Sequence, residues 1–355
     1  MTVFYYLPVF GYLYGMSLSI GIVGLPNVGK STLFNVLTKK SVPAENYPFC
    51  TIDPSVGVVA VPDSRLQKLS DFSASRKTVP AVVEFVDIAG LVKGASEGQG
   101  LGNKFLSHIR EVDAIAEVVR VFSAEGGSAS GGEVIHIYET IEPTRDIEVI
   151  NLELVLSDLE TVSKRLLSIG KEVKAGRKEA IIEKKVLERL QKVLEVGKLT
   201  LGETISELEA PFVKQLQLLT QKPILYVLNA SAVSPTVIGD FKSKIPGAFV
   251  EIDPIFGSGF DELITKAYEI LGLMTYFTTG EDETRAWTIK NGSSAPEAGS
   301  AIHSDFREKF IRAEVIEWHK LLEAGSYVFA REKGWVRTEG KEYIVKDGDV
   351  MEFKI

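Results

Sequence analysis

The feature that most constrains the fold of this chain is residues 24–31, which read Gly-Leu-Pro-Asn-Val-Gly-Lys-Ser. An apolar run over 19–23 precedes this segment, and a helix-like run over 32–37 follows it. A strand, a glycine-rich loop ending in Gly-Lys-Ser and a helix together form the signature of a phosphate-binding loop, in which backbone N–H groups and the helix N-terminus surround an anion. In such a loop Lys30 reaches the β- and γ-phosphates and the Ser31 hydroxyl binds Mg²⁺.

A phosphate-binding loop predicts further ligands downstream. Residues 81–86 are typical of a buried strand, and Asp87-Ile88-Ala89-Gly90 follows them. We expect Asp87 to bind Mg²⁺ through water and the Gly90 N–H to sense the γ-phosphate. Between the loop and this strand, Thr51 is a candidate to complete the Mg²⁺ shell, with an ordinary loop threonine as the alternative. Both segments would then be switches that a triphosphate orders.

The residue after Gly90 bears on catalysis. Ras-like enzymes carry a glutamine there that orients the attacking water, whereas this chain has Leu91. The water-orienting group is therefore expected elsewhere in the chain or on a partner. The side-chain carbonyl of Asn27 could hold K⁺ beside the phosphates, or Asn27 could simply pack within the loop.

Several long segments carry a family resemblance. Residues 24–31, 47–54 (Tyr-Pro-Phe-Cys-Thr-Ile-Asp-Pro) and 87–96 (Asp-Ile-Ala-Gly-Leu-Val-Lys-Gly-Ala-Ser) resemble the Obg-type P-loop proteins, and more narrowly the YchF / Obg-like ATPase family. Segments within 285–350 resemble the C-terminal TGS domain of that family. The resemblance implies a ribosome-associated regulator that hydrolyses nucleotide, with Mg²⁺ bound by Ser31 and Thr51. It also implies that the triphosphate contacts Asn27, Val28, Gly29, Lys30, Ser31 and Thr32.

The chain departs from the family where the base is recognised. The family usually shows Asn followed three residues later by Glu, and here Asn229 is retained while Ala232 stands in place of the acid. The resemblance places a backbone contact to the base at Ala230. The family usually carries a histidine at the position of Glu117, and its proposed role in hydrolysis cannot be transferred to a glutamate. A Gly/Ser-rich insertion over 124–133 is predicted to be a surface loop.

The predicted organisation is an α/β P-loop domain with a doubly wound parallel sheet, formed by residues 16–140 and 205–274. Residues 141–204 lack strand alternation and predict an inserted antiparallel helical hairpin, in which Leu152, Val155, Leu159 and Val162 share one face. Residues 275–355 are expected to form a β-grasp TGS domain on family grounds. We expect residues 1–15 to be a non-native extension, because Met16 is a plausible start.

The hairpin carries a local positive charge. From Lys164 to Lys192 the chain has ten Lys or Arg residues and four Glu residues, a net charge of +6 in a chain whose net charge is −8. This pattern favours either a solvated helix surface with internal ion pairs or a projection that binds RNA phosphates.

Composition limits the remaining functions. One cysteine in 355 residues excludes a disulfide scaffold and fits a reducing compartment, so we expect a cytoplasmic protein. The four histidines lack metal-site spacing, and we expect no membrane or DNA partner. The sequence predicts a Mg²⁺-dependent NTPase that hydrolyses ATP, with GTP left open, as a ribosome-associated switch in translation or stress response. The alternatives are an RNA-binding module with negligible turnover and a GTP-specific GTPase.

Overall fold

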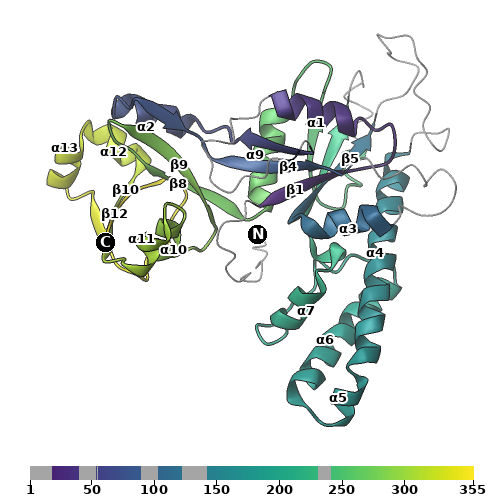
Figure 1. Ribbon diagram of the computed structural model, residues 1–355. Coiled ribbons are helices and arrows are strands. Elements are labelled where there is room, and N and C mark those ends of the chain that lie inside the picture. The colour runs from purple at the N-terminus through teal and green to yellow at the C-terminus, as the bar shows by residue number, and fades with distance from the viewer. Residues whose placement is uncertain (1–17, 40–52, 54, 89–102, 122–141, 231–240) are drawn as a thin grey trace. The chain divides into compact units, whose positions relative to one another are not determined.

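A computed structural model describes residues 18–39, 53, 55–88, 103–121, 142–230 and 241–355 (Figure 1). These residues divide into two compact units. The first contains the described residues up to 57 and residues 84–263, and the second contains residues 58–83 and 264–355. Within the described ranges, no helix combines the length and the apolar character needed to cross a membrane.

One six-stranded sheet has the strand order β2-β4-β1-β5-β6-β7. Its strands are β1 (Ser19–Val23), β2 (Val56–Ala60), β4 (Val82–Asp87), β5 (Ala114–Arg120), β6 (Ile224–Asn229) and β7 (Ala248–Ile252). The pairs β1–β4, β1–β5, β5–β6 and β6–β7 are all parallel. Every residue of β5 and β6 is buried, which explains why these segments are nearly continuous apolar runs rather than alternating ones.

Helices cover both faces of this sheet, with α1 (Lys30–Lys39) and α9 (Phe260–Ile270) on one side and α3 (Asn103–Glu111) and α4 (Pro143–Ser168) on the other (Figure 1). Each strand of the core therefore lies between two helical layers, as in a doubly wound sheet. The predicted α/β P-loop fold is confirmed. In a parallel sheet all strands end at the same edge, so the segments that follow β1, β4, β5, β6 and β7 meet there.

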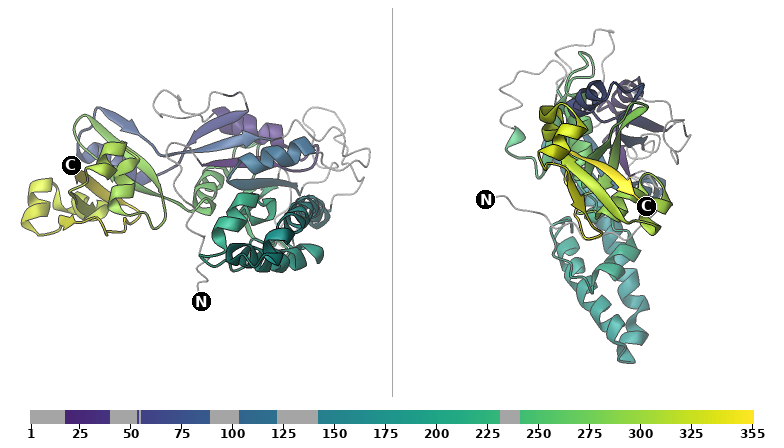
Figure 2. Two further views of the ribbon diagram at one scale, coloured as in Figure 1. Left: turned by 60° about the horizontal axis from the view of Figure 1, so that its bottom comes forward. Right: turned by 90° about the vertical axis from the view of Figure 1, so that its left-hand side faces the viewer.

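The helical hairpin consists of α4, a short α5 (Gly170–Lys174) and α6 (Lys178–Glu195). Its two long helices lie side by side in each view (Figure 1 and Figure 2), with Val155, Val162, Val186 and Leu190 in their shared core. The predicted apolar face is correct at Val155 and Val162. It is wrong at Leu152, which is 51% exposed.

A partly buried ion pair also joins the two long helices. The Arg165 guanidinium donates to both carboxylate oxygens of Glu183, at 2.5 and 3.1 Å. The Glu183 side chain is only 5% exposed, so the pair is shielded from solvent on one side. A two-point contact of this kind fixes the register of one helix against the other.

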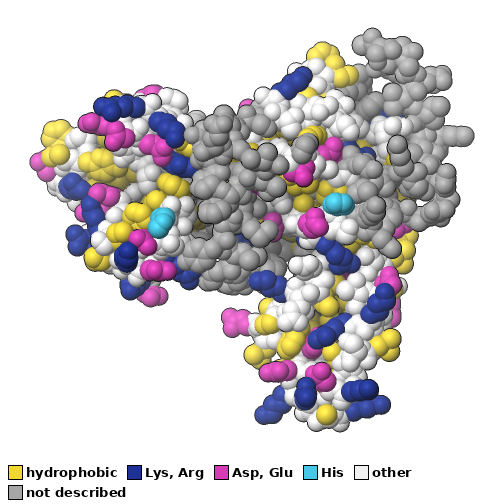
Figure 3. Space-filling view, viewed as in Figure 1, with side chains coloured by type: hydrophobic (Ala, Val, Ile, Leu, Met, Phe, Trp, Pro, Cys, Tyr) yellow, Lys and Arg dark blue, Asp and Glu magenta, His cyan; other side chains and the backbone are white. Residues whose placement is uncertain are grey.

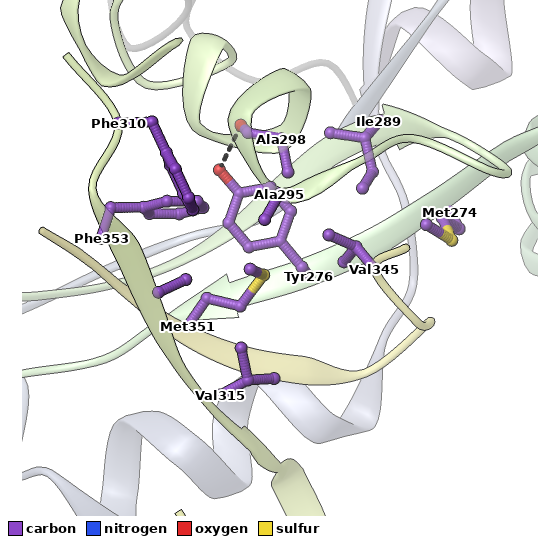
Figure 4. Close-up of a cluster of buried hydrophobic side chains, with 11 residues drawn as sticks. Met274, Tyr276, Ile289, Ala295, Ala298, Phe310, Val315, Val345, Met351 and Phe353 are labelled. Carbon is purple, nitrogen blue, oxygen red and sulfur yellow. Dashed lines mark hydrogen bonds between the residues drawn. The ribbon is translucent and has the colours of Figure 1, made fainter. Parts of the chain in front are cut away.

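The second unit contains a mixed six-stranded sheet with the order β11-β10-β12-β8-β9-β3. Its strands are β3 (Lys77–Val79), β8 (Leu273–Thr278), β9 (Glu283–Lys290), β10 (Arg312–Glu317), β11 (Arg337–Glu339) and β12 (Asp349–Lys354). Tyr276 and Phe353 lie at the centre of its core (Figure 4), and the Tyr276 hydroxyl donates to the Ala298 carbonyl at 2.9 Å. An aromatic hydroxyl buried this deeply requires such a partner.

The helix α2 (Ser64–Phe72) and the strand β3 also belong to this second unit, although the sequence places residues 58–83 within the predicted nucleotide domain. Arg65 explains the grouping. Its guanidinium contacts Asp63 at 2.7 Å and Asp347 at 2.5 Å, and it lies over the Phe277 ring. These two carboxylates raise the pKa of Arg65 above its ordinary value, while burial opposes them. An interaction spanning 282 residues is not visible in the local sequence.

Replacing Asp347 by Ala should destabilise the second unit by about 1–3 kcal/mol, because Arg65 and the Thr275 N–H both lose an acceptor. All three tryptophans lie between 287 and 335, so their fluorescence during urea unfolding follows this unit. The matched control is Asp282→Ala, which removes a 92% exposed partner of Arg76 and should cost less than about 0.5 kcal/mol. Equal unfolding midpoints for the two variants would contradict the assigned role of Asp347.

Candidate nucleotide-binding site

The phosphate-binding loop lies between the end of β1 and the start of α1, as the sequence predicts. Its backbone has positive φ at Gly24 (152°), Asn27 (64°) and Gly29 (101°). A Cβ atom at Gly24 would lie 2.5 Å from the Val118 carbonyl oxygen, and one at Gly29 would lie 2.4 Å from Asn229 Nδ2. Both positions therefore require glycine, because the loop is in direct contact with the neighbouring strands.

Lys30 is buried at the first position of α1, where it is 7% exposed. Its ammonium donates to the Leu25 carbonyl at 2.7 Å, which holds the side chain back over the loop. Burial lowers the pKa of Lys30 to about 8, and the nearby charge of Asp87 partly opposes this effect. The cation is thus desolvated in advance, which strengthens its attraction for an incoming phosphate.

Asp87, at the end of β4, and Ser31, in the first turn of α1, supply hard oxygen ligands of the kind that Mg²⁺ prefers. Ser31 and Thr32 are exposed, so their hydroxyls are accessible to a ligand. This donor set fits Mg²⁺. The other predicted ligands, Thr51 and Gly90, lie outside the described residues, as do Leu91 and the insertion over 124–133.

Asn229 makes a contact that the sequence did not suggest. Its Nδ2 donates to the Val28 carbonyl of the loop at 2.9 Å, and its side chain is 4% exposed. The Ala230 N–H donates to the Ile252 carbonyl of β7 at 2.9 Å. A backbone contact from Ala230 to a base would therefore use its carbonyl oxygen rather than its N–H. Ala232 lies outside the described residues.

Glu117 is buried in the middle of β5 with 1% of its surface exposed, and among the described residues neither carboxylate oxygen has a hydrogen-bond partner. Burial raises the pKa of Glu117 well above its ordinary value, and the charge of Asp146 on α4 raises it further. Arg120, on the same strand, is also buried, and burial lowers its pKa while Asp146 opposes that shift. The sequence signal for this group is a pair of charged residues within a continuous apolar strand.

Comparisons with known proteins agree with the P-loop fold and with the position of the loop described above. The family model MMR_HSR1, described as a 50S ribosome-binding GTPase, matches residues 19–157. The model YchF-GTPase_C, described as a protein of unknown function, matches residues 273–355. The chain is 47% identical to the ribosome-binding ATPase YchF of Bacillus subtilis over 96% of this chain and 99% of that protein. The chain belongs to the YchF family.

Further relatives support the same assignment. The ribosome-binding ATPase YchF of Escherichia coli O157:H7 is 41% identical over 95% of this chain and 99% of its own length. The solved structure of the Schizosaccharomyces pombe YchF GTPase superposes with a TM-score of 0.82 at 35% identity, covering 97% of this chain and all of that one. The family resemblance inferred from the motifs is confirmed over nearly the whole length.

The pKa of Lys30 predicts a pH dependence for nucleotide binding. A bound triphosphate favours the charged ammonium, so binding above pH 8 must take up a proton, and the affinity for ATP should fall by up to about tenfold per pH unit above 8. Calorimetric titrations in two buffers of different ionisation enthalpy would measure the uptake directly. Lys30→Arg keeps its charge throughout and should flatten the dependence. A constant affinity from pH 7 to 9.5 with no proton uptake would contradict the assignment of Lys30.

Proposed function

We propose that this YchF-family protein is a Mg²⁺-dependent NTPase that hydrolyses ATP as a regulatory switch on the ribosome, in translation or stress response. The observation that carries the proposal is the phosphate-binding loop, with its inward-curved backbone and desolvated Lys30. The names of the relatives, ribosome-binding ATPases, support the substrate and the partner. Ribosome association would place the protein in the cytoplasm.

The residues of the loop have separate roles in this proposal. The backbone N–H groups from Asn27 to Thr32 surround the phosphates, and Lys30 neutralises charge on the β- and γ-phosphates. Ser31 and Thr51 would hold Mg²⁺ directly and Asp87 through water, and the ion would supply further charge neutralisation. The Gly90 N–H would sense the γ-phosphate.

A monovalent cation is a second cofactor of the proposal. Asn27 is exposed at a left-handed backbone position in the loop, and in this proposal its side-chain carbonyl coordinates K⁺ beside the phosphates. Such an ion would add positive charge next to the transferred phosphoryl group, which other NTPases obtain from an arginine.

Phosphate release tests the proposal. Wild-type protein with Mg²⁺, K⁺ and saturating ATP should release phosphate, and ribosomes should change the rate. Lys30→Ala and Ser31→Ala should each lower turnover by at least about tenfold, since each removes a charge-assisted contact to phosphate or Mg²⁺. Thermal unfolding of both variants controls for misfolding. Unchanged hydrolysis by Lys30→Ala would contradict the assignment of residues 24–31 as the phosphate-binding loop. ATP binding by the wild-type protein without phosphate release would favour an RNA-binding module instead.

Ala232 bears on whether the protein prefers ATP or GTP. A GTPase recognises guanine with a carboxylate that accepts from N1–H and the 2-amino group, and such a site discriminates by about 10⁴–10⁵. Ala232 offers no acceptor, so ATP should bind at least as well as GTP. Titrating both nucleotides on one preparation decides the question, and binding of GTP tenfold or more tightly than ATP would show that another residue recognises guanine.

Asn229→Ala should weaken the binding of ATP and GTP alike, because it removes the hydrogen bond that shapes the loop at Val28.

The helical hairpin and the C-terminal TGS domain are the proposed ribosome contacts. The outer part of the hairpin, residues 164–192, carries a net charge of +6 on a helical projection from the first unit (Figure 2). RNA phosphates attract such a surface over distances of about a Debye length, roughly 8 Å at physiological salt.

A further inference from the structure

The basic residues of the hairpin fall into two groups in the structure. The paired group forms ion pairs with acidic side chains: Lys164 with Glu160, Arg165 with Glu183, Arg177 with Glu172, Lys184 with Glu188, and Arg189 with Glu209. Within the described part of the chain, the other five have no acidic partner within 4 Å: Lys171, Lys174, Lys178, Lys185 and Lys192. The sequence alone could not separate these groups, because i,i+4 spacing permits several pairings.

Three of the unpaired residues lie on one face of α6. Lys178, Lys185 and Lys192 are seven residues apart, so successive side chains are displaced by about 10.5 Å along the axis and by only about 20° around it. All three are exposed, while Val186 and Leu190 point into the hairpin core. We call Lys178, Lys185 and Lys192 the lysine row.

The charges around the lysine row leave it positive. Glu188 lies between Lys185 and Lys192 on the same face, but Lys184 holds its carboxylate at 3.4 Å. Lys171 and Lys174 extend the positive surface onto α5, at the end of the hairpin where dark blue side chains gather in Figure 3. The row is therefore a local cationic strip on a chain whose net charge is −8.

We propose that the lysine row binds the phosphate backbone of structured RNA, an inference that rests on the proposed association with the ribosome. Charge complementarity identifies the partner. Double-stranded DNA carries one negative charge about every 1.7 Å of its axis and an RNA duplex is densely charged as well, so lysines spaced by about 10.5 Å can approach phosphates whatever the base sequence. Lysine ammonium groups bind phosphates as point charges and read no base, so the contact is independent of sequence.

The test compares two variants that remove the same charge from the same hairpin. The row variant is Lys178→Gln, Lys185→Gln and Lys192→Gln together. The control combines Arg145→Gln, Lys164→Gln and Arg177→Gln, whose side chains are 32–72% exposed and form ion pairs with acids other than Glu188. Binding to a 20-base-pair RNA duplex and co-sedimentation with ribosomes are measured from 50 to 300 mM salt.

The row variant should lower the slope of log affinity against log salt by about 2–3 and weaken ribosome binding at least about tenfold at low salt. The control variant should keep nearly the wild-type slope, and ATP turnover without ribosomes should be equal in all three proteins. Restoring charge with Lys178→Arg, Lys185→Arg and Lys192→Arg should restore the slope. Unfolding midpoints confirm that the variants are folded.

Three outcomes would overturn the inference. Equal losses in the row and control variants would show that only net charge matters. Loss of ribosome binding with an unchanged slope on duplex RNA would identify an acidic protein as the partner. Wild-type binding by the row variant would remove the row from the interface. By contrast, failure of the wild-type protein to sediment with ribosomes would contradict the proposed function itself, whatever the variants do.

Discussion

The hydrogen bond from Asn229 Nδ2 to the Val28 carbonyl joins the end of β6 to the phosphate-binding loop, and the geometry of the site depends on it. The bond is buried, so no water competes for either group. It also holds the loop so close to the end of β6 that Gly29 has no room for a side chain. The residue that the family uses to contact the base thus also shapes the phosphate site, and the two halves of a nucleotide would be held by one connected set of contacts.

A second buried group anchors the hairpin to the same unit. The carboxylate of Asp158 on α4 is fully buried and accepts from the Leu219 and Thr220 N–H groups at 3.1 and 2.7 Å. Burial raises the pKa of Asp158, although these bonds oppose the shift. Arg110 of α3 donates to Ser157 at 3.1 Å beside it. Arg110 also donates to Thr161 at 3.3 Å, so these contacts tie α3 to the root of the hairpin.

The sequence predicted those features that local pattern determines. The loop, its flanking strand and helix, and the hairpin follow from spacing and periodicity within about 25 residues. It failed where a contact joins distant segments, because Arg65 binds Asp347 across the chain and draws residues 58–83 into the second unit. It also missed the division of the hairpin cations into paired and unpaired groups, since that division depends on rotamers and on which acid lies nearest.

Glu117 shows how burial changes the chemistry that a side chain can perform. Hydrolysis needs a group that orients water, and a general base must reach that water in its ionised form. Glu117 is buried, and burial raises its pKa well above the ordinary value, which disfavours the ionised form that a general base needs. Of the other described groups, the Asn229 amide shapes the loop and Lys30 can only donate. In the proposed function the described residues supply phosphate binding and charge, and the water-orienting group is expected in another segment or on a partner. If the proposed site binds nucleotide with no base among its described residues, it is suited to a switch whose rate a partner controls.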